Sequence, residues 1–145
     1  MLFRSYKSPG GEALGFYSSL RLRCMSPLKL KQKHTIHGKE HERTIGIKVT
    51  IEVFKSSVWK PFRTAEVFIL YDYGIDDIRG NLTFLKSASA SSTYVVGDKN
   101  LGRSLDAAIE VVEKEGLEKE VKAQTISLWN EIEQSFVGER KPRIW

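Results

Sequence analysis

The sequence predicts a mixed α/β protein, with strands concentrated in its first half and helices toward its end. Apolar and polar side chains alternate from Thr44 to Phe54, which is typical of a strand with one buried face and one wet face. The run from Ala65 to Tyr71 is almost continuously apolar and rich in β-formers, so we expect a second, interior strand there. From Leu117 onward, apolar residues recur at helical spacing and predict an amphipathic helix.

Shorter elements are expected before the first of these strands. Residues 9–11 are Pro-Gly-Gly and break the chain, and a short helix is expected over residues 12–19. Residues 20–24 alternate like a strand. Residues 26–43 are polar and basic, and we predict that they form a mobile loop.

The last third of the chain is expected to form a small lobe of its own. A patch of serine and alanine at residues 87–92 offers nothing bulky to bury and favours a surface connection. We therefore predict two domains, 1–86 and 87–145. A hairpin is expected over residues 94–102, followed by a helix that Ser104 caps and Gly116 ends.

The charge distribution favours a polyanionic partner. Residues 1–60 contain 12 Lys and Arg against 4 Asp and Glu, whereas residues 61–145 contain 11 against 14. Lysine and arginine that neutralise phosphates are the usual source of sequence-independent affinity for nucleic acid. The alternative is a solvated basic face that has no partner.

Two classes of protein are disfavoured. A single cysteine, Cys24, cannot form an internal disulfide, which favours a reducing compartment. No secretory signal and no apolar stretch of membrane-spanning length is present, so we expect a cytoplasmic protein without a membrane partner.

Two segments resemble the RecA recombinase family, in order and separation as well as in residues. Pro9–Leu22, with its Gly-Gly-Glu-Ala-Leu start, is similar to the end of the family's second DNA-binding loop and the helix and strand after it. Lys60–Ile75 is similar to the Pro-Phe, Ala-Glu and Ile-Leu-Tyr run of the late core strands. A weaker match extends over Tyr94–Phe136. The resemblance implies late antiparallel strands of a RecA-like ATPase core at 1–86, and a C-terminal lobe of a hairpin and two helices at 87–145. As an isolated fragment this is an α+β fold.

The sequence contains no phosphate-binding loop. Such a loop needs Gly-x-x-x-x-Gly-Lys-Ser/Thr so that backbone amides and a lysine can cradle phosphates while a hydroxyl binds magnesium. The only Gly-Lys pair, Gly38-Lys39, is followed by Glu40, and Lys33 stands where the first glycine belongs. We expect no ATPase activity from this chain alone, and magnesium would come from a missing N-terminal part.

The resemblance implies that ATP is bound between neighbouring subunits. The residues that would face it are Lys55, Lys60, Pro61, Tyr71 and Asp72. Lys55 matches a lysine that acts on the γ-phosphate of the neighbouring subunit's nucleotide, whereas Ser57 replaces a second such lysine, for which Lys60 is a substitute. Tyr71 matches an aromatic residue beside the adenine. The alternatives are a solvated lysine at a strand end and a tyrosine at a core edge.

DNA contacts are expected from three places. The candidate residues are Arg4, Lys7, Ser8, Gly10, Gly11, Lys29, Lys31, Lys33, Lys99 and Arg103. Glycines in a loop allow backbone amides to approach DNA phosphates, although a turn before a helix explains the glycine pair equally well. The basic stretch, with Lys39 and Arg43, is suited to a second DNA strand, or is only solvated. Phe16 matches a subunit-contact position, but is also a plausible core aromatic.

Two clusters resemble catalytic or metal sites and are assigned neither role. His34, His37 and His41 lack the further ligands that fix a metal geometry. The carboxylates Asp72, Asp76 and Asp77 follow a strand and are interpreted as turn formers.

We therefore expect the DNA-binding and subunit-interface part of a RecA-type, ATP-dependent homologous recombination and repair protein. Its partners would be single- and double-stranded DNA, and RecA-like subunits or a complementary N-terminal fragment. A non-enzymatic DNA-binding or filament-modulating module is the alternative, and a non-functional fragment is a third.

Overall fold

The computed structural model describes residues 13–138, and the chain divides into two compact units between Tyr71 and Asp72. The α+β fold expected of the isolated chain is confirmed, because the first unit is built on an antiparallel sheet and the second is mainly helical. This division in packing precedes the domain boundary predicted between residues 86 and 87. None of the described helices is long and apolar enough to cross a membrane.

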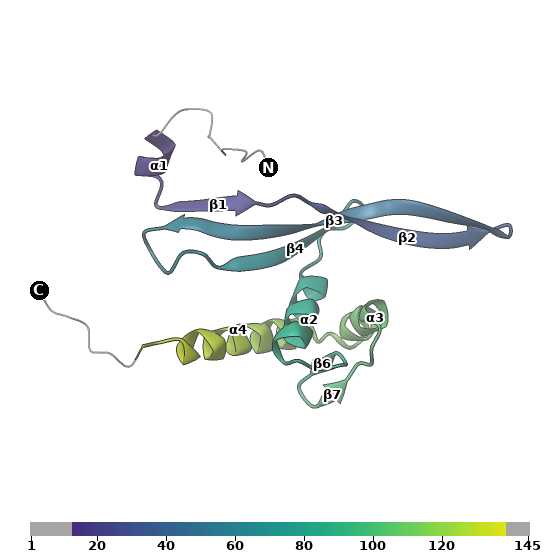
Figure 1. Cartoon of the computed structure of the whole chain (residues 1–145). Helices are drawn as coiled ribbons and strands as arrows, with labels where there is room; N and C mark the ends of the chain where they lie inside the picture. Colours follow the sequence, from purple (N-terminus) through teal and green to yellow (C-terminus); the bar gives the residue numbers. More distant parts are fainter. Residues whose placement is uncertain (1–12, 139–145) are drawn as a thin grey trace, which may run out of the picture. The chain divides into compact units, whose positions relative to one another are not determined.

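The first unit is organised around one long strand, β3 (Lys39–Ser56), which pairs antiparallel with three others (Figure 1). These are β1 (Leu20–Cys24), β2 (Leu28–Ile36) and β4 (Thr64–Leu70). A short helix, α1 (Ala13–Tyr17), precedes β1. The predicted helix and the predicted strands of this unit are confirmed, and the run ending before Tyr71 lies directly beside β3.

The pairing register places β1 and β2 along the same edge of β3. Lys48 of β3 pairs with Leu28 of β2 and with Phe68 of β4, so β2 and β4 lie on opposite edges. Glu52 pairs with Arg23 of β1 and with residue 64 of β4, which puts β1 opposite β4 as well. The hairpin of β2 and β3 therefore continues beyond the end of β4.

The prediction of a mobile loop over residues 26–43 is wrong. Residues 28–36 form β2, and the turn at His37 and Gly38 returns the chain into β3. Both turn residues have positive φ, 51° and 76°, which is the geometry of the two-residue turn that matches the twist of a hairpin. Leu28, Leu30 and Ile36 alternate with polar residues and are the signal for this strand, but the many lysines of the stretch suggested a loop.

The burial predicted for the strands is also wrong. On β3, Ile47 and Ile51 are only half-buried, as are the polar residues on the other face, and Gly46 is the one buried residue of the strand. On β4, Phe68 alone is buried. The physical reason is that the described part of this unit contains a single sheet and only one helix, the five-residue α1. An α/β sheet is buried on both faces only when helices cover both.

The second unit consists of three helices and a two-stranded hairpin. Its helices are α2 (Asp77–Ala88), α3 (Leu105–Glu115) and α4 (Glu118–Ser135). The strands β6 (Val95–Val96) and β7 (Lys99–Asn100) form the predicted hairpin, and the two-residue strand β5 (Gly74–Ile75) precedes α2. The prediction of a helix capped by Ser104 and ended by Gly116 is confirmed, because Gly116 adopts the left-handed conformation with φ of 68°.

The hydrophobic core of the second unit is continuous across its elements. Leu82, Val96, Val112 and Val121 are almost completely buried, and they come from α2, β6, α3 and α4 respectively. Leu128 of α4 packs against this core, as its helical spacing predicted.

Helix α2 was not predicted, and the interpretation of Asp76 and Asp77 as turn formers is wrong. Asp76 is the N-cap of α2 and accepts a hydrogen bond from the Arg79 amide over 3.0 Å, while Asp77 is the first helical residue. Asp72 does lie in a turn. Ile78, Leu82 and Leu85 form the buried stripe of α2 at helical spacing.

Candidate nucleic-acid and nucleotide interface

The residues expected to face a nucleotide lie at opposite ends of the β3–β4 ladder. Lys55 is at the C-terminal end of β3, whereas Tyr71 follows β4, and its amide donates to the Ile45 carbonyl oxygen over 3.0 Å. Ten residues of β3 separate Lys55 from Ile45, which at about 3.3 Å per residue is roughly 33 Å. One nucleotide cannot contact both ends within a single chain.

Lys55 is engaged inside the first unit. Its Nζ donates a hydrogen bond to the Gly15 carbonyl oxygen over 2.6 Å, so the side chain connects β3 to α1. Lys55 is half-buried. To reach an external phosphate it would have to exchange this carbonyl for the new acceptor.

The turn between β3 and β4 presents an aromatic side chain flanked by cations. Trp59 is 53% exposed, and Lys60 Nζ and Arg63 Cζ lie 6.0 and 5.9 Å from its ring centre. Phe62, which follows Pro61, has a φ of 64° that is rare for a bulky residue, and it is 68% exposed. Its amide bonds to the Val53 carbonyl oxygen over 2.7 Å, which holds this conformation. Trp59 was missed by the sequence reasoning, although the run Trp-Lys-Pro-Phe-Arg contains the signal.

A second aromatic contact lies on the face of the sheet where β1 meets β3. Arg21 Cζ and Arg23 Cζ are 5.3 and 3.8 Å from the ring centre of Phe54, and Arg23 also pairs with Glu52 over 3.5 Å. The alternation Leu-Arg-Leu-Arg in β1 places both arginines on one face. The alternation in the sequence predicted the strand, but not the contact of its arginines with Phe54.

Tyr71 and Asp72 are accessible at the other end of the ladder. Tyr71 is 62% exposed, and Asp72 is exposed in the turn after β4. An exposed ring of this kind is suited to stacking on a flat base.

The lysines of β2 are unequal as candidates for phosphate binding. Lys31 Nζ is 2.6 Å from a Glu42 carboxylate oxygen, and Lys33 Nζ is 2.8 Å from one of Glu40. The hydrogen bond and charge of Lys31 lower the pKa of Glu42, so this carboxylate stays ionised. Lys29 is exposed and pairs with Ile47 in the sheet register. Two of the three predicted phosphate contacts therefore already have anionic partners.

The three histidines are not gathered into one cluster by the hairpin. His34 and His41 lie directly opposite each other on β2 and β3, whereas His37 is in the turn. Among residues 13–138, no group of three or more His, Cys, Asp or Glu side chains is arranged to hold a metal ion.

The remaining predicted residues are scattered. Lys99 pairs with Glu115 of α3, and Arg103 is exposed before α3. Phe16 is 77% exposed on α1 and is not a core residue. The glycine-led DNA candidates Arg4, Lys7, Ser8, Gly10 and Gly11 lie outside the described residues.

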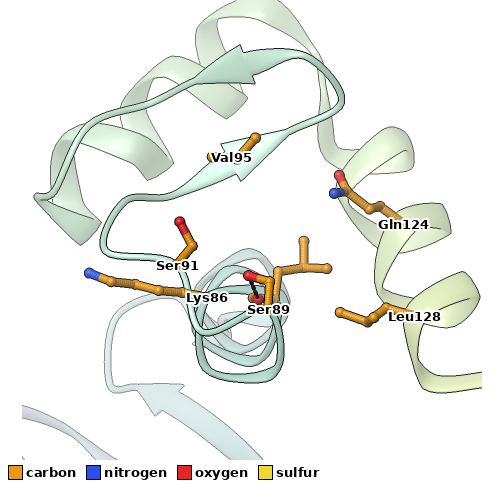
Figure 2. Close-up of a pocket in the computed structure, with 7 residues that line it drawn as sticks. Lys86, Ser89, Ser91, Val95, Gln124 and Leu128 are labelled. Carbon is orange, nitrogen blue, oxygen red and sulfur yellow. Dashed lines mark hydrogen bonds between the residues drawn. The ribbon is translucent and has the colours of Figure 1, made fainter. Parts of the chain in front are cut away.

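The second unit contains a pocket that no prediction anticipated. Its volume is about 280 Å³, and it is lined by Leu85, Lys86, Ser89, Ser91, Val95, Gln124 and Leu128 (Figure 2). The Ser89 hydroxyl donates to the Leu85 carbonyl oxygen over 2.6 Å, and Lys86 Nζ lies 4.1 Å from the ring centre of Tyr94. Ser91 and Gln124 are also hydrogen-bonded, to the Thr93 carbonyl oxygen and the Gly97 amide. The polar side chains of the lining thus have partners within the unit, and we assign the pocket no ligand.

Comparisons with known proteins identify the family to which the chain is similar. Residues 1–76 match the family model described as the RecA N-terminal domain. The chain is 33% identical over 110 residues to Protein RecA of Borrelia duttonii, covering 73% of this chain and 29% of that protein. It is 32% identical over 127 residues to Protein RecA of Thermus aquaticus, covering 82% of this chain and 34% of that protein. The chain thus spans about a third of the length of these relatives.

Proposed function

Since the chain belongs to the RecA family, we propose that it supplies DNA-binding and subunit-facing surfaces to an ATP-dependent recombination and repair protein. The observation that carries this proposal is the placement of Lys55 and Tyr71 at opposite ends of one strand ladder. A nucleotide between two subunits can be contacted by the Tyr71 end of one and the Lys55 end of the next. This arrangement is head-to-tail, and such contacts generate filaments when they do not close.

The chemistry at each end suits its half of the nucleotide. At the Tyr71 end, an exposed phenol ring offers a face to a base, with Asp72 next to it. At the Lys55 end, the ammonium group, together with Lys60 in the segment that follows β3, would stabilise negative charge on a phosphate from the neighbouring subunit. Magnesium and the phosphate cradle would be supplied by another part of the recombinase, because this sequence contains no Gly-x-x-x-x-Gly-Lys-Ser/Thr.

The apolar face of the sheet supports an association with further recombinase structure. Its half-buried members are Ile47, Val49, Ile51, Val53, Val67 and Ile69. Described residues of the first unit include only one short helix, and a sheet face of this composition is normally covered. RecA-like subunits or a complementary N-terminal segment are the partners we propose for it.

The nucleotide role is tested by complementation. A purified RecA-type ATPase whose own lysine equivalent to Lys55 has been removed is mixed with this chain, and ATP turnover is measured. We expect turnover to be restored by the unmodified chain and by Lys119→Gln, a charge-matched control on α4, but not by Lys55→Gln. Restoration by Lys55→Gln would refute the role of this lysine.

The DNA role is tested by titrating single-stranded DNA binding against salt, with and without ATP. Phosphate contacts predict that the logarithm of the affinity falls linearly with the logarithm of the salt concentration. Binding that is indifferent to ATP, together with a failure to complement, would favour a non-enzymatic DNA-binding module. A lack of binding at low salt would overturn the DNA role.

A further inference from the structure

The two faces of the β2–β3 hairpin have different charges. Directly opposed residues of an antiparallel pair share a face, so the register assigns each side chain to one side. The lysine face contains Lys29, Lys31, Lys33, Glu40 and Glu42. The histidine face contains Gln32, His34, Lys39, His41 and Arg43. Both carboxylates of the hairpin are therefore on the lysine face.

The lysine face is largely self-neutralised. Lys31 pairs with Glu42 and Lys33 pairs with Glu40, in diagonal contacts of 2.6 and 2.8 Å. For a DNA phosphate to bind there, it would have to displace a carboxylate or approach it closely, and like charges repel.

The histidine face offers cations without a carboxylate. Arg43 uses one N–H to donate to the Glu42 carbonyl oxygen over 3.1 Å, and the guanidinium has further donors. Gln32, His34, His41 and Arg43 line a groove of about 270 Å³ together with Ile36 and Ile45. From Lys39 to Arg43 this face is roughly 13 Å long, which corresponds to about four steps along one strand of duplex DNA.

We propose that the histidine face of the hairpin, and not the lysine face, is the surface that contacts nucleic-acid phosphates. This inference rests on the proposed function, because it names the surface through which the first unit binds DNA. It also reassigns the role predicted for Lys31 and Lys33 to residues on the opposite side of the same strands.

The face assignment is tested with two variants of the full chain that have the same net charge. Lys39→Gln/Arg43→Gln removes two cations from the histidine face, and Lys31→Gln/Lys33→Gln removes two from the lysine face.

Binding of a labelled single-stranded oligonucleotide is measured by fluorescence anisotropy across a salt series. We expect the first variant to lose about tenfold or more in affinity and to flatten the salt slope by about 1.4, which is the slope for two phosphates on a single strand. We expect the second variant to stay within about threefold of the unmodified chain.

Further measurements separate the possible outcomes. Arg43→Lys keeps the charge and should retain most of the affinity, and circular dichroism should show that each variant keeps its fold. An equal loss in the two face variants overturns the face assignment alone. If the unmodified chain does not bind at low salt, the DNA role itself is overturned.

Discussion

Asp76 combines two structural roles that can be separated by substitution. Its Oδ1 accepts from the Arg79 amide over 3.0 Å and caps α2, and its Oδ2 accepts from Arg79 Nε over 2.9 Å. Arg79 also donates to Asp106 over 2.8 Å and so connects α2 to α3. Burial works against the charge on Arg79, but the hydrogen bonds to Asp106 and Asp76 outweigh it and raise its pKa. Asp76 itself is 5% exposed.

The cost of losing Asp76 follows from these contacts. Removal of an N-cap costs about 1 kcal/mol, within a range of about 0.5–2. A hydrogen bond that involves a charged group contributes about 1.5–3 kcal/mol, and here the partner is a partly buried guanidinium. We therefore expect Asp76→Ala to destabilise the second unit by about 2–4 kcal/mol. Asp76→Asn keeps a capping oxygen and should cost about half as much.

The measurement is urea unfolding of the full chain, followed by far-ultraviolet circular dichroism. The long helices α2, α3 and α4 are all in the second unit, so the helical signal follows that unit. The chain has two units, and the transition attributed to the second one must therefore be fitted separately.

Asp77→Ala is the matched control. Asp77 is adjacent, exposed and in the first turn of α2, where the interaction of its charge with the helix dipole is worth at most about 1 kcal/mol. If Asp76→Ala costs no more than Asp77→Ala, the account of the cap and ion pair is refuted.

Three further predictions concern the sheet, the core and the hairpin. A Cβ at Gly46 would lie 2.3 Å from the Ile69 carbonyl oxygen, so Gly46→Ala should lower the free energy of unfolding by about 1–3 kcal/mol in thermal or urea experiments. The control is Gly138→Ala, where the added Cβ meets no atom within 4 Å and the change should be less than about 0.5 kcal/mol. Leu82→Ala should lower the free energy of unfolding of the second unit by about 2–5 kcal/mol, because this side chain is 1% exposed. A smaller loss would mean that neighbouring side chains repack into the cavity. Because the pKa of Glu42 is lowered from 4.5, its ion pair with Lys31 is fully formed above pH 4.5 and is lost as the pH falls through the lowered pKa. In Lys31→Gln, an NMR titration should show the pKa of Glu42 moving back toward 4.5.

Much of the second unit followed from local signals. Ser104 and Gly116 have side-chain and backbone properties that terminate a helix wherever they occur, and both helix ends lie where they were predicted. The helical spacing of Val121 and Leu128 likewise predicted the packing of α4. Helix α2 carried the same kind of signal, with an aspartate before an apolar stripe, but three nearby carboxylates suggested a turn instead.

The hairpin and the ladder depend on pairing between distant residues, which periodicity does not reveal. The alternation in β2 is partly hidden by lysines on one face and a mixture of leucine, glutamine and histidine on the other. The pairing of Lys31 with Glu42 becomes visible only when the register is known. In the same way, the resemblance to the family predicted Lys55 and Tyr71 as nucleotide contacts, but it did not predict that the length of a strand separates them.

The turn at His37 and Gly38 also bears on how the first unit folds. The strands β2 and β3 meet at this two-residue turn, so their pairing can start there with very little loop-closure entropy. Isolated hairpins form in about 1–10 μs. Docking of β1 onto the far end of β3 must close a much longer loop and so comes later. Gly38→Ala, which strains the turn at φ of 76°, should therefore slow refolding in stopped-flow experiments more than it speeds unfolding. The surface that we propose for DNA would then be the earliest part of the sheet to assemble.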